Sequence, residues 1–275
     1  MDMGPQFPPS VYPEYYKNQS VGEQHNPDAS QDNQLSSARL GDADSQITVA
    51  LEYLTGHNRP QSYEQAFKWL KLAEQNGSEE APVYLASMYY FGEGVQQNYH
   101  EAFQRFSKAA NAGNSLAQFN LHIMYDVGYG VLVDKKEALY WLRKSAEAGF
   151  AKAQTKLGML YKSGGLLQRN LKKSIEWLHR AANAGDAEAQ IQLAKNYAMG
   201  IGARQNYLVS YIWFNIAGEH CEPGIERQQC IDYTHSIASI LSPTEMEKAK
   251  RLVTLKKQDL AEKSNSLTVE KVIIQ

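Results

Sequence analysis

The chain lacks the features that mark membrane-spanning proteins and small secreted proteins. No stretch approaches the run of about 18 apolar residues that a transmembrane helix needs. The start of the chain has neither the basic region nor the apolar region of a secretory signal peptide. Two cysteines, Cys221 and Cys230, are too few for a disulfide framework in a chain of 275 residues. These absences predict a cytoplasmic protein without a membrane span, although a substrate of signal-independent secretion would show the same pattern.

The chain also lacks an excess of either charge. Its 28 basic and 30 acidic residues give a formal net charge of −2, which argues against nucleic acid as a partner. The seven histidines include no H-E-x-x-H motif, so we expect no metal and no cofactor. Neither a phosphate-binding glycine loop nor a nucleophile elbow is present. We therefore predict no catalytic residues and no enzyme. A hydrolase is the alternative for which no catalytic constellation is found.

What the chain does contain is an internal repeat of 36 residues. Four columns of residues share this period, and such agreement identifies a repeat architecture. One glycine column consists of Gly41, Gly77, Gly113, Gly149 and Gly185. A second consists of Gly56, Gly92, Gly128, Gly164 and Gly200. The tyrosine column is Tyr53, Tyr89, Tyr125, Tyr161 and Tyr197, and the aromatic column is Trp69, Trp141, Trp177 and Trp213 with Arg105 as its exception.

Each column has a physical reason within a helix hairpin. Ala117, Leu121 and Tyr125 have the spacing i, i+4, i+8, which places them on one face of a first helix. Gly128 suits the left-handed turn that ends this helix. The second helix then begins at a side chain that can cap free backbone amides, and a hairpin of this kind must stack on its neighbours to bury its apolar face. The capping column is Ser62, Asn98, Asp134, Asn170 and Asn206.

These residues carry a family resemblance. From Gly113 to Gly149 the chain reads A-Q-x-x-L-x-x-x-Y-x-x-G-x-G-V-x-x-D-x-x-x-A-x-x-W-x-x-K-S-A-x-x-G. This pattern resembles the Sel-one-like repeat family, which is related to the tetratricopeptide repeats and has a slightly longer unit. The resemblance covers residues 41–220 in five repeats and implies an all-α fold, a right-handed α/α superhelical solenoid. The departures are Arg105 in the aromatic column, Leu166 at the second loop glycine, Pro82 in the glutamine column and the loop at residues 56–60.

The two ends of the chain differ from the repeats. Residues 1–40 are rich in proline and polar residues and predict a disordered or extended arm. Tyr12, Tyr15 and Tyr16 in this arm could form a short docking peptide. Residues 221–262 predict C-terminal capping helices, the last of which opens with the capping box Ser242-Pro243-Thr244-Glu245. We expect residues 263–275 to be a flexible tail, in which residues 267–274 could form a strand.

The resemblance also implies where a partner would bind. In tetratricopeptide-like stacks the first helix of each hairpin lines the concave face. Here its residues are apolar in the second and third repeats, and the fourth repeat adds lysines. An apolar patch beside basic residues suits an amphipathic helix or an extended peptide with an acidic end. If the register is wrong by one residue, some of these side chains pack between repeats instead. The predicted partner-binding residues are Val83, Tyr90, Phe91, Leu116, Phe119, Ile123, Val127, Lys152, Met159 and Lys162.

The sequence therefore favours a protein-interaction adaptor or scaffold that holds a peptide or protein partner. A bacterial regulator or host-directed effector is one biological context, and an immunity or chaperone-like protein that sequesters a cognate toxin is the alternative. A homo-oligomer is possible, but nothing in the sequence indicates one. His122 stands in a column of small residues, where it is either a tolerated core residue or a partner contact. Cys221 and Cys230 are ordinary thiols or a facultative disulfide.

Overall fold

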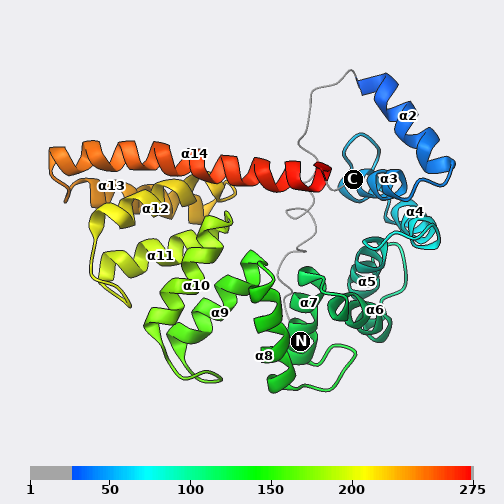
Figure 1. Cartoon of the computed structure of the whole chain (residues 1–275), viewed down its shortest axis with the longest axis horizontal. Coiled ribbons are helices and arrows are strands. Elements are labelled where there is room, and N and C mark those ends of the chain that lie inside the picture. The colour runs from blue at the N-terminus through cyan, green and yellow to red at the C-terminus, as the bar shows by residue number, and fades with distance from the viewer. Residues whose placement is uncertain (1–26, 274–275) are drawn as a thin grey trace, which may run out of the picture. The chain divides into compact units, whose positions relative to one another are not determined.

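The computed structural model describes the backbone of residues 27–273 and the side chains of residues 33–262. Within this range every regular element is a helix (Figure 1), which confirms the predicted all-α class. No helix in the described range has the length and apolar character needed to cross a membrane. The helices are α2 (Pro27–Arg39), α3 (Ala43–Thr55), α4 (Tyr63–Gln75), α5 (Ala81–Phe91), α6 (Tyr99–Asn111), α7 (Ser115–Val127), α8 (Lys135–Glu147), α9 (Ala151–Ser163), α10 (Leu171–Asn183), α11 (Ala187–Met199), α12 (Tyr207–His220), α13 (Ile225–Ala238) and α14 (Pro243–Ile273).

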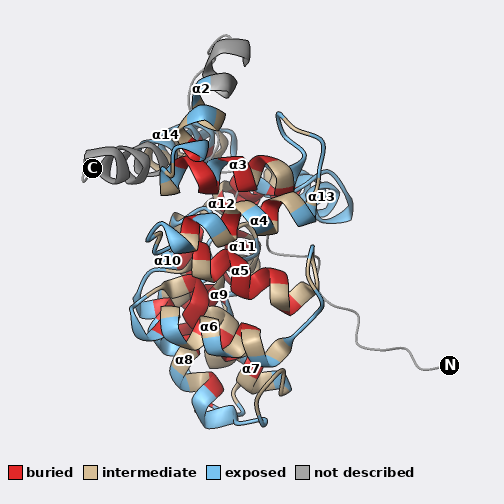
Figure 2. Cartoon of the chain, turned by 90° about the vertical axis from the view of Figure 1, so that its right-hand side faces the viewer, coloured by how far each residue is buried: buried red, intermediate tan, exposed pale blue. Residues whose placement is uncertain are grey.

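The chain divides into two compact units, and each has its own core. The N-terminal unit comprises residues 1–112 with residues 127–133, and its core lies between α3, α4 and α5. The C-terminal unit comprises residues 113–126 with residues 134–275. In this unit one cluster of buried side chains joins α8 to α9, and a larger one runs from α10 to α14. Buried residues lie in stripes along the helices (Figure 2), as stacked amphipathic hairpins require.

Two hydrogen bonds recur in all five hairpins and explain two of the sequence columns. The backbone amide of each capping residue donates to the carbonyl oxygen of the column tyrosine of the same repeat, over 2.8 to 3.0 Å. The side chain of the capping residue accepts a backbone amide from the first turn of the second helix. The capping column is therefore confirmed as a set of true N-caps, which hold each loop to the helix that follows it.

The loop glycines also have a spatial reason. A β-carbon on Gly94 would lie 2.3 Å from the carbonyl oxygen of Tyr63, and one on Gly130 would lie 2.2 Å from that of Tyr99. Each of these loops therefore rests directly on the preceding repeat, where only glycine fits. Leu166 breaks this column, and there the loop takes another path in which Gly164 and Gly165 have positive φ angles of 83° and 96°.

Arg105, the exception in the aromatic column, has its own partners. Its guanidinium lies 2.5 Å from Glu74 and 2.7 Å from Glu101. It also lies over the ring of Tyr89, 5.4 Å from the ring centroid. Burial opposes ionisation of Glu74, but hydrogen bonds from Lys71 and Arg105 outweigh it and lower the pKa of Glu74. At this position, ion pairs with Glu74 and Glu101 and a cation–π contact with Tyr89 thus take the place of aromatic packing.

The structure corrects the prediction for the end of the N-terminal arm. Residues 27–39 form the helix α2, whereas an extended or disordered segment was expected up to residue 40. Ala38 is buried, and the Gln46 side-chain amide donates to its carbonyl oxygen over 2.9 Å. Gln154 and Gln190 make the same bond, eight residues back, to the second helix of the preceding repeat. α2 therefore takes the place of a preceding second helix, and the tyrosines at positions 12, 15 and 16 lie outside the described residues.

The C-terminal helices follow the prediction at their start and depart from it at their end. α13 is present, and Ser242 and Glu245 form the expected reciprocal capping box. Ala249 and Val253 of α14 are buried against the rest of the cap. The backbone stays helical to Ile273, so the strand considered for residues 267–274 does not occur up to that residue. A helix of this length continues because its sequence contains neither proline nor glycine after Pro243.

Candidate functional site

The ten predicted partner-binding residues fall into both units. Four of them, Val83, Tyr90, Phe91 and Val127, belong to the N-terminal unit. The other six, Leu116, Phe119, Ile123, Lys152, Met159 and Lys162, belong to the C-terminal unit. The two sets are described one after the other.

In the N-terminal set, Tyr90 is the centre of an aromatic cluster. Its ring lies 4.9 Å from that of Phe91, 5.3 Å from that of Tyr99 and 5.7 Å from that of Tyr129. Burial, together with the two neighbouring tyrosines, raises the pKa of Tyr90. Val83 is also buried, whereas Val127 is 49% exposed. Tyr90 and Val83 therefore offer little area to a partner, and Phe91 and Val127 offer more.

In the C-terminal set, the apolar residues gather on α7. Leu116 is buried, whereas Phe119 and Ile123 are half-buried and keep part of their surface open. The ring of Phe119 lies 5.1 Å from that of Phe150, which stands at the start of α9. Both phenylalanines pack on the edge of the core between α8 and α9. The pair therefore forms a fixed aromatic surface at the junction of the third and fourth repeats.

Phe150 occupies a position that the other repeats give to a helix cap. The equivalent residues are Asp42, Ser78, Asn114 and Asp186, and in each the side chain accepts a backbone amide of its helix. Phe150 makes no such hydrogen bond. A missing N-cap costs about 1 kcal/mol of helix stability. A residue that departs from a local rule in this way is expected at a functional site.

A row of lysines follows the phenylalanine pair along α9. Lys152, Lys156 and Lys162 share one side of this helix with Met159, at steps of three or four residues. Burial lowers the pKa of Lys162, and Lys195 of α11 adds to the effect. Within residues 33–262 the structure shows no salt bridge at Lys156, Lys162 or Lys195. The row therefore places basic groups along one side of α9.

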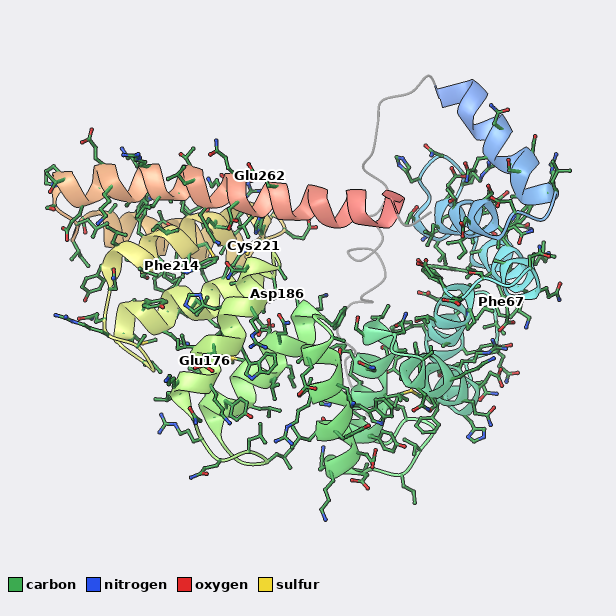
Figure 3. The ribbon with its side chains drawn as sticks, in the orientation of Figure 1. Phe67, Glu176, Asp186, Phe214, Cys221 and Glu262 are labelled. Carbon is green, nitrogen blue, oxygen red and sulfur yellow. The ribbon has the colours of Figure 1, made fainter. Side chains whose placement is uncertain are left out.

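One carboxylate borders this row. Burial and then the nearby Asp186 raise the pKa of Glu188 at the start of α11, while Lys156 and Lys152 act in the opposite direction. Asp186, which begins α11 (Figure 3), is bound to the backbone amide of Ala189 and to the hydroxyl of Thr155. Of the acidic groups beside the lysine row, Asp186 thus serves the fold as a helix cap.

His122 is a core residue of the same junction. It is buried, and its Nδ1 lies 3.0 Å from the carbonyl oxygen of Ala138, to which it donates. Burial lowers the pKa of His122, although the hydrogen bond to Ala138 opposes this. The packing supports the structural interpretation of this histidine over a partner contact. Among the described residues no group of three or more His, Cys, Asp and Glu side chains could hold a metal ion.

The predicted binding residues did not include Phe150 and Lys156. The signal for Phe150 was present, because it is the only apolar residue in a column of caps. Lys156 lies in a column that was not assigned to the groove, although Lys156 and Lys152 both act to lower the pKa of Glu188. From here on, the α7–α9 surface means Phe119, Ile123, Phe150, Lys152, Lys156, Met159 and Lys162.

Comparison with known proteins agrees with this architecture. The Sel1 repeat model matches residues 43–78, 80–114, 115–150, 151–186 and 187–220, which is more than half of the chain. A Sel1 repeat protein from Oxalobacter formigenes is 28% identical with a TM-score of 0.69, over 81% of this chain and 64% of its own. A protective antigen of uropathogenic Escherichia coli with an SLR fold is also 28% identical, with a TM-score of 0.64, over 94% of this chain and 54% of its own.

A more distant structure, a protein of Pseudomonas aeruginosa, is 16% identical with a TM-score of 0.52, over 83% of this chain and 89% of its own. At that identity the likeness concerns the fold alone. The chain spans less than two thirds of the length of the first two structures. No curated protein matches the chain.

Proposed function

This chain belongs to the Sel1 repeat family, and on that premise we propose that it is a protein-binding scaffold that holds its partner on the α7–α9 surface. The observation that carries the proposal is the phenylalanine at the capping position of α9. Phe150 does not make the side-chain capping hydrogen bond that every equivalent residue makes. Its ring instead packs beside that of Phe119 and enlarges the apolar surface there. Half-buried aromatic residues in fixed positions are typical anchors of protein interfaces.

The chemistry of the partner follows from the lysine row. A segment with aromatic or aliphatic side chains would pack on Phe119, Phe150 and Ile123. Acidic residues one or two helical turns away would reach Lys152 and Lys156. The positive charge of the row would speed association and fix the direction of the segment more than it would raise affinity. An amphipathic helix or an extended peptide with an acidic end meets both requirements.

Non-enzymatic binding agrees with the family, whose members are generally scaffolds. Lys162 donates to the side-chain oxygen of Gln192, which is a positioning contact and not a catalytic one. We therefore propose the role of an adaptor, with a regulator or effector as its biological context.

The test is affinity purification from the native host, with the full chain as bait. The variant Lys152→Glu/Lys156→Glu replaces one half-buried and one exposed lysine of this surface. The matched control is Lys136→Glu/Lys172→Glu, which makes the same change of charge at exposed positions on α8 and α10. We expect a protein that wild type and control retain and the α9 variant loses. We also expect a synthetic acidic-apolar segment of that protein to bind the wild-type chain.

A second variant examines the apolar half of the surface. Replacing Phe119 and Ile123 by glutamate should abolish binding and leave the helical circular dichroism intact. Unfolding of that variant would identify the two residues as core, and the proposal would then depend on the lysine variant. Equal retention of every captured protein by wild type and by the Lys152→Glu/Lys156→Glu variant would refute the α7–α9 surface as the binding site.

A further inference from the structure

The two cysteines of the chain meet where the repeats end. Cys221 is the C-cap residue of α12 (Figure 3), and Cys230 lies on α13. Their exposed fractions are 7% and 1%, and both belong to the core cluster that joins α12 to α13 and α14. Nine positions separate them in the sequence, so the segment between them is a short loop followed by the first turns of α13.

The geometry turns the two thiols toward each other. Gly218 lies one helical turn before Cys221, and a β-carbon on Gly218 would be 3.6 Å from the β-carbon of Cys230. Residues three positions apart lie on the same face of a helix, so Cys221 also faces α13 at close range. Burial raises the pKa of both thiols, that of Cys230 to about 12.

We propose that Cys221 and Cys230 form a reversible intramolecular disulfide when the chain meets a small-molecule disulfide such as oxidised glutathione. The Cys221 thiolate, which is the more exposed of the pair, attacks one sulfur of the oxidant. This forms a mixed disulfide and releases one reduced thiol. The Cys230 thiolate then attacks the Cys221 sulfur and releases the second. Two protein thiols are oxidised, and the oxidant accepts their two electrons and two protons.

The disulfide acts on the cap of the repeat array. The segment from residue 221 to residue 230 becomes a closed loop, and α13 is tied to the end of α12. Closing a loop restricts the open state of the segment more than its folded state, so local opening of α13 becomes rarer. Because burial keeps most of the thiol protonated, the reaction is slow at neutral pH and faster in alkaline solution. This inference goes beyond the proposed function, since it concerns the cap and not the partner surface.

The experiment uses the full chain, reduced and then incubated with oxidised glutathione. We expect the intact mass to fall by about 2 Da as the disulfide closes, and proteolysis to yield a peptide in which Cys221 is linked to Cys230. Backbone amides of α13 should exchange with deuterium roughly tenfold more slowly after oxidation. Dithiothreitol should reverse both changes. The single variants Cys221→Ser and Cys230→Ser should show neither the loss of mass nor the slower exchange.

Three results would overturn the inference. The first is a wild-type chain that remains fully reduced. The second is a wild-type chain that stops at the mixed disulfide. The third is a product that consists only of disulfide-linked dimers. If circular dichroism shows that a serine variant is unfolded, the alanine variants Cys221→Ala and Cys230→Ala provide the same control with an apolar side chain.

Discussion

Two junctions of the C-terminal unit occupy equivalent places one repeat apart and are made of opposite chemistry. At the junction of the third and fourth repeats, the ring of Phe119 lies against that of Phe150. At the next junction, the hydroxyl of Thr155 donates to the carboxylate of Asp186 over 2.9 Å. That carboxylate also accepts the backbone amide of Ala189 and so caps α11. The two junctions thus share a side-chain contact between equivalent positions, and this contact is aromatic in one and polar in the other.

The two junctions differ in what they contribute to the fold. The polar junction satisfies a free amide at the start of a helix, as the fold requires. The aromatic junction leaves this amide without a side-chain cap and presents partly exposed rings beside a row of lysines. Within this chain, Asp186 follows the polar residues of its column, whereas Phe150 departs from them.

The largest expected effect comes from exchanging one junction for the other. The double variant Phe119→Thr/Phe150→Asp gives the first junction the residues of the second. We expect partner binding to weaken by about thirtyfold or more, as the loss of an interface hot spot does. The free energy of unfolding should change by less than about 2 kcal/mol, because a new helix cap offsets part of the lost apolar contact. Calorimetric titration with the captured partner segment and urea denaturation measure the two quantities.

If the Phe119→Thr/Phe150→Asp variant still binds the partner at full strength, the proposed difference between the two junctions is wrong. The stability measurement separates this outcome from simple unfolding. If the double variant loses its cooperative urea transition, the single variant Phe150→Asp repeats the binding test. It restores the cap and leaves Phe119 in place.

A smaller effect is expected at the polar junction. Asp186→Ala removes the acceptor of both the Ala189 amide and the Thr155 hydroxyl. The free energy of unfolding should fall by about 1 to 2 kcal/mol, since a helix cap and a second hydrogen bond are lost together. Thr155→Val removes only the hydroxyl and should cost less than Asp186→Ala. An equal cost for the two variants would show that the cap at Asp186 contributes nothing. Partner binding should be unchanged in both variants.

The smallest effect concerns pH at the aromatic junction. Burial lowers the pKa of His122, the hydrogen bond to Ala138 and the nearby Asp126 oppose this, and Lys156 and Lys135 reinforce it. The unfolded chain therefore takes up the proton more readily than the folded chain, and stability falls as the pH drops below about 6.5. We expect the unfolding free energy of wild type to fall more steeply between about pH 7 and pH 5 than that of His122→Ala. Equal slopes for the two proteins would mean that the pKa of His122 is the same in the folded and the unfolded chain.

Much of the fold was predictable from the sequence, because the same residue pattern occurs in five repeats and each occurrence supports the others. The period of 36 residues, the capping column and the capping box at Ser242 all recur as hydrogen bonds in the structure. α2 was missed because its sequence is polar and its helical state depends on α3, where Gln46 binds the carbonyl oxygen of Ala38. The extent of α14 was missed because its far end has no clear apolar period.

The sequence by itself determined the repeat, the helix boundaries within it and the caps, since these depend on residues close together in the chain. Only the tertiary structure decided which side chains of the first helices are covered, because burial depends on the neighbouring repeat. It placed Tyr90 and Leu116 among the buried residues, set Phe150 against Phe119 across 31 positions of sequence and brought Cys230 of α13 against the last turn of α12. Periodicity specifies a face of a helix, but only the stacked neighbour determines how much of that face remains for a partner.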